Sequence, residues 1–299
     1  MTKIFIYRDK EGASRIWQNN FLKISKQMGI PAVGIAFDNL LGRPRSPAAI
    51  LRSIRKRYQP GDKFVARFNE RREANFKPLY AAVEQIFGKC NIFPDRLAVE
   101  LYNNKRLQAD FFRDKDYPIP AQSWVRSEAE LERFMQAHDL SFPIVRKESR
   151  GASSIGVSLI EGPKTGYPFV AQEFCAHNPG DMRIMVVGHK IFGYTRTNRP
   201  GDFRASGLGK VEFIDDLPLP CVQAAYRISR ECGFVCMAYD FIKNNRGQWV
   251  CVEISYTTLS ERPSLCRYYY DARRGFARID RPVGMVERLI LDRLVAAEE

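Results

Sequence analysis

The chain has 299 residues, a hydrophobic content of 45% and a formal net charge of +13 at pH 7. A chain of this size can bury a large core, and without a run of eighteen apolar residues a membrane protein is not expected. The positive charge favours anionic partners, but the basic residues lack the aromatic interleaving of a platform for single-stranded nucleic acid.

The start of the chain, MTKIFIYRDKEG, places charged residues directly after a short strand-like segment, where a secretory signal would continue as an apolar run. The seven cysteines are an odd number in mostly apolar contexts, which is typical of buried thiols in a reducing compartment. None of the three histidines lies near Cys232 and Cys236, so a zinc site is not expected. We therefore expect a soluble, cytoplasmic protein that binds a small anionic ligand instead of nucleic acid or a membrane, either alone or as a homo-oligomer.

Residues 1–94 alternate between strand and helix patterns. Apolar runs predict strands at 3–7, 32–37 and 63–68, and helical spacing predicts helices at 16–28, 47–58 and 77–87. In the first helix, Ile16 is expected to face inward. The alternation predicts a small domain built on a parallel sheet, with its ligand edge beyond the carboxyl ends of the strands. Arg67 and Asn69 follow the third strand and are therefore candidate substrate-side residues.

Residues 95–168 contain two helices and a second pattern of strands. Asn103 and Asn104 offer N-caps for a helix at 105–112, which places Lys105 in a first turn, where a cation opposes the helix dipole. An anionic ligand beside Lys105 would resolve this conflict. A further helix is predicted at 128–137 by the apolar positions Leu131 and Phe134.

The stretch 143–157, PIVRKESRGASSIGV, reads as a strand, a loop of small residues and a second strand. Backbone N–H groups of the loop, including Gly151, Ser153 and Ser154, can surround an anion while Lys147 supplies a positive charge. Phosphate is the ligand that this pattern favours. The alternative is an ordinary hairpin with a Ser-rich loop and a solvated lysine.

Residues 169–299 are richest in strand patterns. Strands are predicted at 169–171, 184–187 and 191–196, followed by a polar, Gly-rich segment, a helix at 220–232, a hairpin of 235–243 with 248–255, and a last helix at 283–297. A four-residue turn would place Asp240 opposite Cys251, on the face that also carries Glu253 and Ser255. Converging carboxylates repel unless a cation lies between them, which suits Mg²⁺ bridging phosphates. A pair of exposed acids on a sheet edge is the alternative.

The motifs occur in an order that resembles the ATP-grasp superfamily, and they are most similar to the RimK-like carboxylate-amine ligases. The resemblance covers about residues 94–256 and rests on the helix-opening Lys105, the Lys147 strand with its small-residue loop, Gln172-Glu173-Phe174-Cys175, Asp181-Met182-Arg183, Gly201-Asp202-Phe203-Arg204, Asp240, and Glu253-Ile254-Ser255. It implies a mixed α/β (α+β ATP-grasp) fold. A small pre-grasp domain (1–94) would precede a central subdomain (95–168) and a C-terminal subdomain (169–299) that clasp ATP between them.

The resemblance also implies roles for individual residues. ATP would be bound by Lys105, Lys147, the loop with Gly151, Ser153 and Ser154, the hinge Glu173, Phe174 and Cys175, and Asp181 at the ribose. Arg183 and Arg204, with Arg196 as a further candidate, would stabilise the transferred phosphoryl group. Mg²⁺, with Mn²⁺ as an alternative, would be bound by Asp240, Glu253 and Ser255, although the family usually has Asn at the position of Ser255.

The implied activity is an ATP- and Mg²⁺-dependent ligase that joins a small carboxylate to an amine, such as an amino acid or peptide, through an acyl phosphate. Two alternatives keep the nucleotide site. One is a small-molecule kinase of the same superfamily, and the other is a nucleotide-binding protein whose metal site has decayed and which does not turn over. The sequence does not name the substrates.

Overall fold

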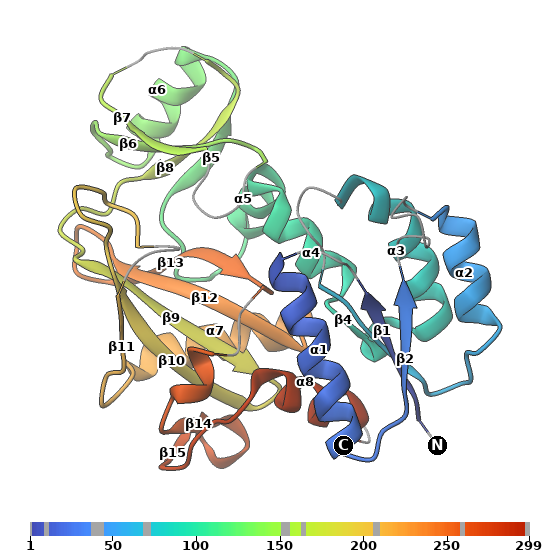
Figure 1. The fold of residues 1–299 in the computed structure, drawn as a ribbon. Helices are drawn as coiled ribbons and strands as arrows, with labels where there is room; N and C mark the ends of the chain where they lie inside the picture. The colour runs from blue at the N-terminus through green and yellow to red at the C-terminus, as the bar shows by residue number, and fades with distance from the viewer. Residues whose placement is uncertain are drawn as a thin grey trace.

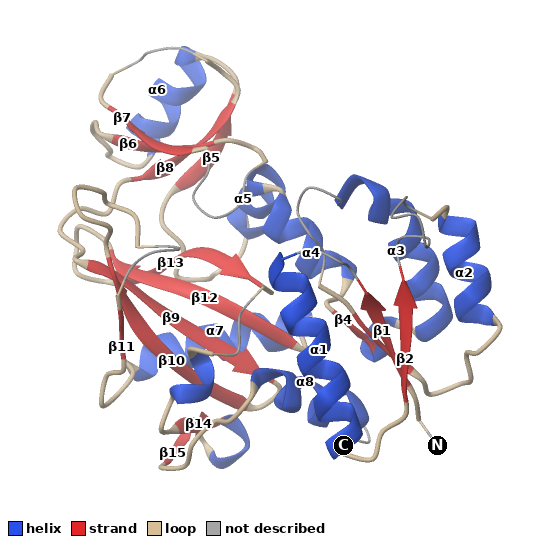
Figure 2. Cartoon of the chain, in the orientation of Figure 1, coloured by secondary structure: helices blue, strands red, loops and turns tan. Residues whose placement is uncertain are grey.

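The computed structural model describes residues 2–8, 12–36, 45–67, 73–150, 156–162, 166–205, 210–257 and 261–296. The chain forms the mixed α/β fold that the sequence predicts, with three sheets (Figures 1 and 2). Within these ranges no helix is long and apolar enough to cross a membrane.

The N-terminal sheet is parallel throughout, as the alternating pattern predicts. Its strand order is β2 (Ala32–Ala36), β1 (Ile4–Arg8), β3 (Lys63–Val65) and β4 (Ile92–Phe93). Helix α1 (Gly12–Gln27) lies on one side, and α2 (Pro47–Arg55) and α3 (Glu73–Phe87) lie on the other (Figure 2). A short 3-10 helix, η2 (Lys89–Asn91), leads into β4.

One side-chain orientation in this domain differs from the prediction. Ile16 is 51% exposed, whereas Trp17 is 3% exposed and packs against Phe21 and Phe93. The larger aromatic side chain takes the inward position because it buries more apolar surface.

The central sheet is antiparallel and has its own small core. Its order is β5 (Gln122–Val125), β8 (Phe169–Glu173), β6 (Ile144–Lys147) and β7 (Val157–Ile160), with α6 (Glu128–Ala137) packed on one face. Leu131 and Phe134 point into this core as expected. Because β8 pairs with β5 and β6, the boundary proposed between residues 168 and 169 cuts the sheet, and a boundary after Glu173 keeps it whole.

Two consecutive helices connect the N-terminal and central sheets. Helix α5 (Lys105–Arg113) begins at the predicted Asn104 N-cap, whose side chain accepts a hydrogen bond from the Leu107 N–H at 3.0 Å. The preceding helix α4 (Arg96–Asn103) was not predicted, although Asp95 caps it by accepting from the Ala98 N–H at 3.0 Å.

The large C-terminal sheet has the order β13 (Trp249–Ser255), β12 (Cys236–Lys243), β9 (Gly180–Val187), β10 (Lys190–Thr197), β14 (Tyr269–Asp271) and β15 (Ala277–Ile279), and β11 (Val211–Glu212) also pairs with β10. Helix α7 (Leu219–Cys232) covers one face, and α8 (Val286–Val295) packs beside α1. Two 3-10 helices, η3 (Pro263–Leu265) and η4 (Ala272–Arg274), flank β14.

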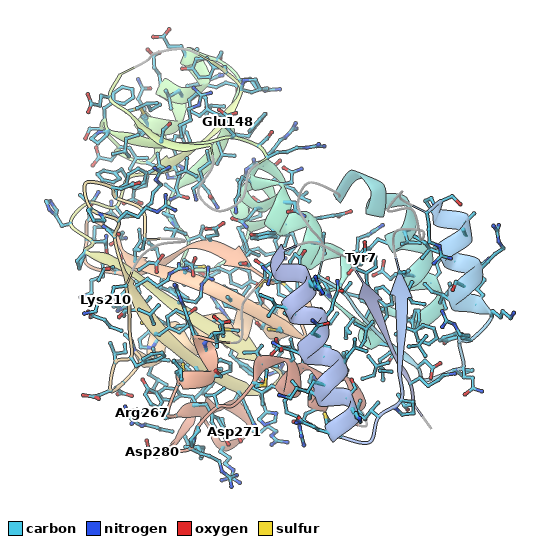
Figure 3. The ribbon with its side chains drawn as sticks, viewed as in Figure 1. Tyr7, Glu148, Lys210, Arg267, Asp271 and Asp280 are labelled. Carbon is cyan, nitrogen blue, oxygen red and sulfur yellow. The ribbon has the colours of Figure 1, made fainter. Side chains whose placement is uncertain are left out.

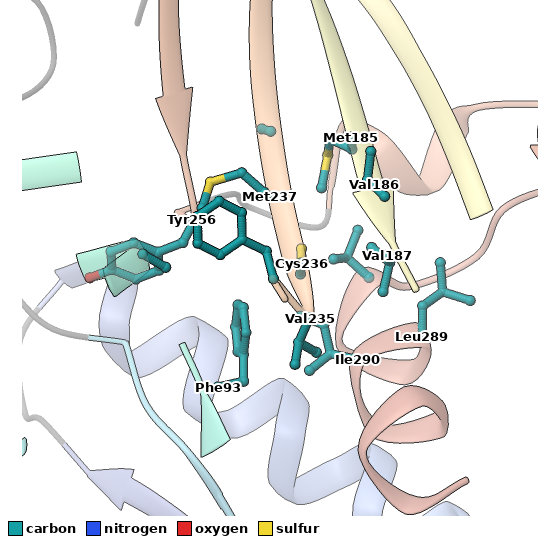
Figure 4. Close-up of a cluster of buried hydrophobic side chains, with 14 of the residues drawn as sticks. Phe93, Met185, Val186, Val187, Val235, Cys236, Met237, Tyr256, Leu289 and Ile290 are labelled. Carbon is teal, nitrogen blue, oxygen red and sulfur yellow. The ribbon is translucent and has the colours of Figure 1, made fainter. Parts of the chain in front are cut away.

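The N-terminal and large sheets share one continuous core. Phe93 of β4, Met237 of β12 and Ile290 of α8 belong to one cluster of buried side chains, in which Ile290 lies near Val235 (Figure 4). The central sheet has a separate core, built around Phe169 and Phe134. The molecule therefore consists of one large packed unit and a smaller one, and these two units meet at the site described next.

Candidate active site

A cavity lies where the central sheet faces the large sheet. It is lined by α5, by β6 and β8, by the segment that follows β8, and by β12 and β13. Of the residues predicted to form the site, it gathers Lys105, Lys147, Glu173, Phe174, Cys175, Asp181, Arg204, Asp240 and Glu253. Glu148, another lining residue, belongs to the central subdomain (Figure 3).

Strand alternation aims the key side chains into this cavity. On β6, Ile144 faces the α6 core, so Val145 and Lys147 face the opposite side, where the cavity lies. On β12, the Tyr239 hydroxyl lies 2.6 Å from Ser229 of α7, so the next residue, Asp240, points away from α7 and into the cavity.

Two buried lysines bond to neighbouring residues of β13, Lys105 to the Glu253 carboxylate and Lys147 to the Val252 carbonyl. Lys105 is 7% exposed, and its Nζ lies 2.6 Å from Glu253 Oε1. Lys147 is 9% exposed and donates to the carbonyl of Val252 at 3.0 Å. The two lysines come from the central part of the chain and the carboxylate comes from the large sheet, so this contact connects both walls of the cavity.

The environment lowers the pKa of Lys147. Burial lowers this pKa to about 8, and the positive charge of Lys105 adds to the effect, while Glu253 opposes it. An anion that enters the site would stabilise the charged form of this buried lysine, which lies beside a second cation. The site is therefore suited to bind phosphate.

Asp240 stands at the centre of a network of ion pairs. Arg183 binds it through both oxygens, with Nε to Oδ1 at 2.7 Å and Nη2 to Oδ2 at 2.8 Å. Arg196 lies 2.8 Å from Asp240 Oδ2 and also binds Asp181 at 2.7 and 2.5 Å. Arg196 thereby joins the two acids, a connection that the sequence motifs did not indicate.

The network shifts the pKa values of Asp240 and Asp181 in opposite directions. Burial would raise the pKa of Asp240, but Arg183 and Arg196 outweigh it and hold this pKa well below the usual range. Burial and the neighbouring charge of Asp240 raise the pKa of Asp181 to about 6, against the attraction of Arg196. Burial also acts on Glu253, but Lys105 more than compensates and lowers its pKa.

The register of the hairpin differs from the prediction. Five residues connect β12 and β13, so that Lys243 pairs with Trp249, and a β-bulge next to Asp240 places this residue opposite Glu253 instead of Cys251. The bulge adds one residue to β13 and breaks its simple alternation. As a result the two acids are direct neighbours across the strands, closer than the regular register would make them.

These two acids fit a divalent metal ion that also binds phosphate. Among the described residues, no three His, Cys, Asp or Glu side chains gather as a metal site. Asp240 and Glu253 are both held in the ionised form and offer oxygen ligands, and Mg²⁺ commonly takes one or two protein carboxylates and completes its shell with phosphates and water.

Ser255 and Arg67 are not brought to the cavity. The Ser255 hydroxyl is 3.0 Å from Thr257 Oγ1 and accepts from the Thr257 N–H at 3.2 Å, which makes a local turn of the chain. Arg67 follows β3 in the N-terminal sheet. Asn69, Gly151, Ser153 and Ser154 lie outside the described residues.

Arg204 lies on the segment that covers the cavity. It binds the Asp202 carboxylate, with Nη2 to Oδ2 at 2.7 Å, and donates to the carbonyl of Val157 at 2.9 Å. Phe203 packs edge-on against Phe174 at 5.8 Å between ring centroids. The polar segment predicted from the sequence therefore reaches across from the large sheet to β7.

Gln172 is a cavity-lining residue that the motifs pointed to only as part of the hinge. Its side chain is buried, lines the cavity and has no hydrogen-bond partner for Oε1 among the described residues. An unpaired acceptor is costly to bury, so it marks a place where a ligand donor would be favourable. The available signal was a polar residue directly after the apolar run Phe169-Val170-Ala171 of β8.

The chain was compared with models of known protein families. A model of the RimK-like ATP-grasp domain matches residues 103–261, more than half of the chain. No curated protein sequence is similar enough to count as a match.

Solved structures share the fold over nearly the whole chain. A RimK domain ATP-grasp protein from Sphaerobacter thermophilus is 15% identical with a TM-score of 0.62, covering 99% of this chain and 100% of that one. The macrocyclase MdnC with precursor peptide MdnA, from Microcystis aeruginosa, is 16% identical with a TM-score of 0.61 and 99% coverage of both chains. The D-cycloserine synthetase DcsG is 15% identical with a TM-score of 0.63 and 98% coverage of both chains. Family match and fold agree, and the chain belongs to the RimK-like ATP-grasp family.

Proposed function

We propose that this protein is an ATP- and Mg²⁺-dependent ligase that joins a carboxylate to an amine through an acyl phosphate. The observation that supports it best is the convergence of Lys105, Lys147, Asp240 and Glu253 in one buried cavity between two separate cores. Family membership supports the same reaction class.

In this proposal the two lysines bind the ATP phosphates, and the segment from Glu173 to Cys175 binds the adenine. Gln172 faces the base beside them, and Asp181 remains the candidate for the ribose. When bound between Asp240 and Glu253, Mg²⁺ would offset charge on the phosphate oxygens.

The reaction needs no nucleophile from the protein. A carboxylate oxygen of the substrate attacks the γ-phosphorus, the bond to the β-γ bridging oxygen breaks, and ADP leaves. The amine then attacks the acyl carbon, the bond to the phosphate oxygen breaks, and the amine nitrogen loses a proton. Arg183, Arg196 and Arg204 supply fixed positive charge for the phosphoryl and acyl phosphate groups.

The structures that share this fold suggest the class of substrate. They include peptide-bound enzymes, namely MdnC and the ligase PsnB, which was solved with a minimal precursor, Mg and ADP at 12% identity and a TM-score of 0.63, covering 98% of this chain and 97% of that one. They also include a synthetase named for a small molecule, DcsG. We therefore propose an amino acid or a peptide for at least one of the two substrates.

Hydroxylamine trapping tests the reaction. Candidate carboxylates are first screened for ATP-dependent ADP release, and hydroxylamine then replaces the amine. A ligase should give a hydroxamate with ADP and phosphate. A stable phosphorylated product without hydroxamate would instead identify a kinase, and ATP binding without ADP release from any carboxylate would identify a protein that does not turn over.

A further inference from the structure

Two asparagines bond the segment that would bind the adenine base to a hairpin of the large sheet. The hinge segment, residues 174–178, connects β8 of the central sheet to β9 of the large sheet, and the turn segment, residues 244–248, connects β12 to β13. Asn245 of the turn accepts from the Ala176 N–H at 2.9 Å and donates to the Phe174 carbonyl at 3.0 Å. Its amide thereby pairs with the hinge as a neighbouring strand would.

Asn178 ties the other end of the hinge to the same hairpin. Its Nδ2 donates to the carbonyls of Cys175 and Ala176, both at 3.1 Å, and to the carbonyl of Lys243 at 2.8 Å. Its Oδ1 accepts from the Lys243 N–H at 2.9 Å. The hinge is thus held on both sides of Cys175 by side-chain amides.

Around Cys175, this arrangement leaves a donor and a neighbouring acceptor of the backbone for a ligand. Among the described residues, the Cys175 N–H has no hydrogen-bond partner, and the Glu173 carbonyl receives only a weak contact from the Cys175 thiol at 3.9 Å. Both residues line the cavity. A donor beside an acceptor matches the edge of adenine, whose N1 accepts and whose amino group donates, whereas guanine presents the opposite order.

We propose that Asn245 and Asn178 are positioning residues that determine the base specificity of the nucleotide site. They act through the hinge, by fixing the peptide groups around Cys175 so that the free N–H and carbonyl point in one direction. Asn245 also connects base recognition to the hairpin that carries Asp240 and Glu253. The inference rests on the proposed ATP site and names residues outside the phosphate and metal contacts.

The test compares three ligands by calorimetry: ATP, GTP and inorganic triphosphate, which has no base. In Asn245→Ala the affinity for ATP should fall about tenfold, since two hydrogen bonds that order the hinge are lost. The affinity for triphosphate should not change, because Lys105 and Lys147 remain in place. The preference for ATP over GTP should fall by the same factor as ATP binding.

Two further variants make the result specific. Arg246→Ala alters an exposed side chain of the same turn and should behave as the wild type toward all three ligands. Asn245→Asp keeps the acceptor for the Ala176 N–H but loses the donor to Phe174, so its ATP affinity should fall between those of wild type and Asn245→Ala.

The outcomes separate this inference from the proposed function. A wild-type protein that binds neither ATP nor triphosphate would overturn both. Tight ATP binding without preference over GTP, an unchanged preference in Asn245→Ala, or an equal loss of ATP and triphosphate affinity in that variant would overturn the inference alone.

Discussion

At the scale of single residues, the site holds its charges in pairs that a ligand must rearrange. Lys105 neutralises Glu253 at 2.6 Å, and two arginines neutralise Asp240. A metal ion that approaches the free protein therefore meets carboxylates that are already paired. Phosphates attract Lys105 and release Glu253, so nucleotide should prepare the metal site.

We expect Lys105→Gln to bind Mn²⁺ in the absence of nucleotide about tenfold more tightly than the wild type, because a charged hydrogen bond worth roughly 1.5–3 kcal/mol no longer competes for Glu253. Electron paramagnetic resonance of free Mn²⁺ measures this directly. Glu253→Gln serves as the control and should bind Mn²⁺ weakly with or without Lys105. Equal affinities in wild type and Lys105→Gln would show that the ion pair does not limit metal binding.

The lowered pKa of Lys147 predicts how ATP binding depends on pH. Burial, with Lys105, brings this pKa to about 8 in the free protein, and bound phosphates stabilise the charged form and raise it. Binding then takes up a proton above pH 8, so ATP affinity should stay level below about pH 8 and fall as the pH rises above it. Calorimetry in buffers of different ionisation enthalpy measures the proton uptake.

Lys147→Met is the matched variant. It should bind ATP more weakly at pH 7 and lose the decline above pH 8, since no proton is taken up at this position. A decline that persists in Lys147→Met would assign the pH dependence to another group.

At the scale of secondary structure elements, the N-cap of α5 fixes where Lys105 lies. Asn104→Ala removes the bond to the Leu107 N–H and should lower the free energy of unfolding by about 1 kcal/mol. It should also weaken ATP binding, because the first turn that carries Lys105 loosens. Urea unfolding and calorimetry measure the two effects.

The cap of α6 provides the control. Ser127 accepts from the Glu130 N–H at 3.3 Å and lies outside the cavity lining, so Ser127→Ala should cost a similar stability without changing ATP affinity. Asn104→Asp keeps an acceptor and should preserve both properties. If Asn104→Ala and Ser127→Ala had the same effect on ATP, the cap would have no role in placing Lys105.

The pairing of β9 with β10 positions the arginines. A Cβ on Gly193 would clash with the carbonyl oxygen of Arg183, so Gly193→Ala must separate strands that carry Arg183 and Arg196. We expect a loss of about 1–3 kcal/mol in the free energy of unfolding. Gly162→Ala, at a position where a Cβ meets nothing within 4 Å, should be neutral in the same urea titration. A neutral Gly193→Ala would mean that the strands adjust without cost.

At the scale of the whole molecule, the cavity lies between two units with separate cores. A nucleotide that contacts both units should therefore stabilise the folded protein. At a hundredfold excess over Kd, ATP stabilises the folded state by about 2.7 kcal/mol, which corresponds to a rise in Tm of roughly 4 °C for a chain of this size. Thermal unfolding with a non-hydrolysable ATP analogue measures the shift. The Tm of Lys147→Met should rise little at the same concentration of analogue. A wild-type Tm that does not change with the analogue would contradict a nucleotide site shared by the two units.

The sequence by itself determined the elements whose signals are local. Helix α6 has the predicted limits, the Asn104 cap begins α5, and Lys147 ends strand β6, because caps and periodicity act within a few residues. The order of the motifs was enough to identify the family. Only the tertiary structure decided how residues far apart in the chain are arranged. It placed Asp240 opposite Glu253 through the bulge, Arg196 between Asp181 and Asp240, and the Asn245 side chain in hydrogen bonds with the hinge. Each of these depends on strand register or on packing between segments far apart in the chain, and a single extra residue in one strand changes which side chains meet.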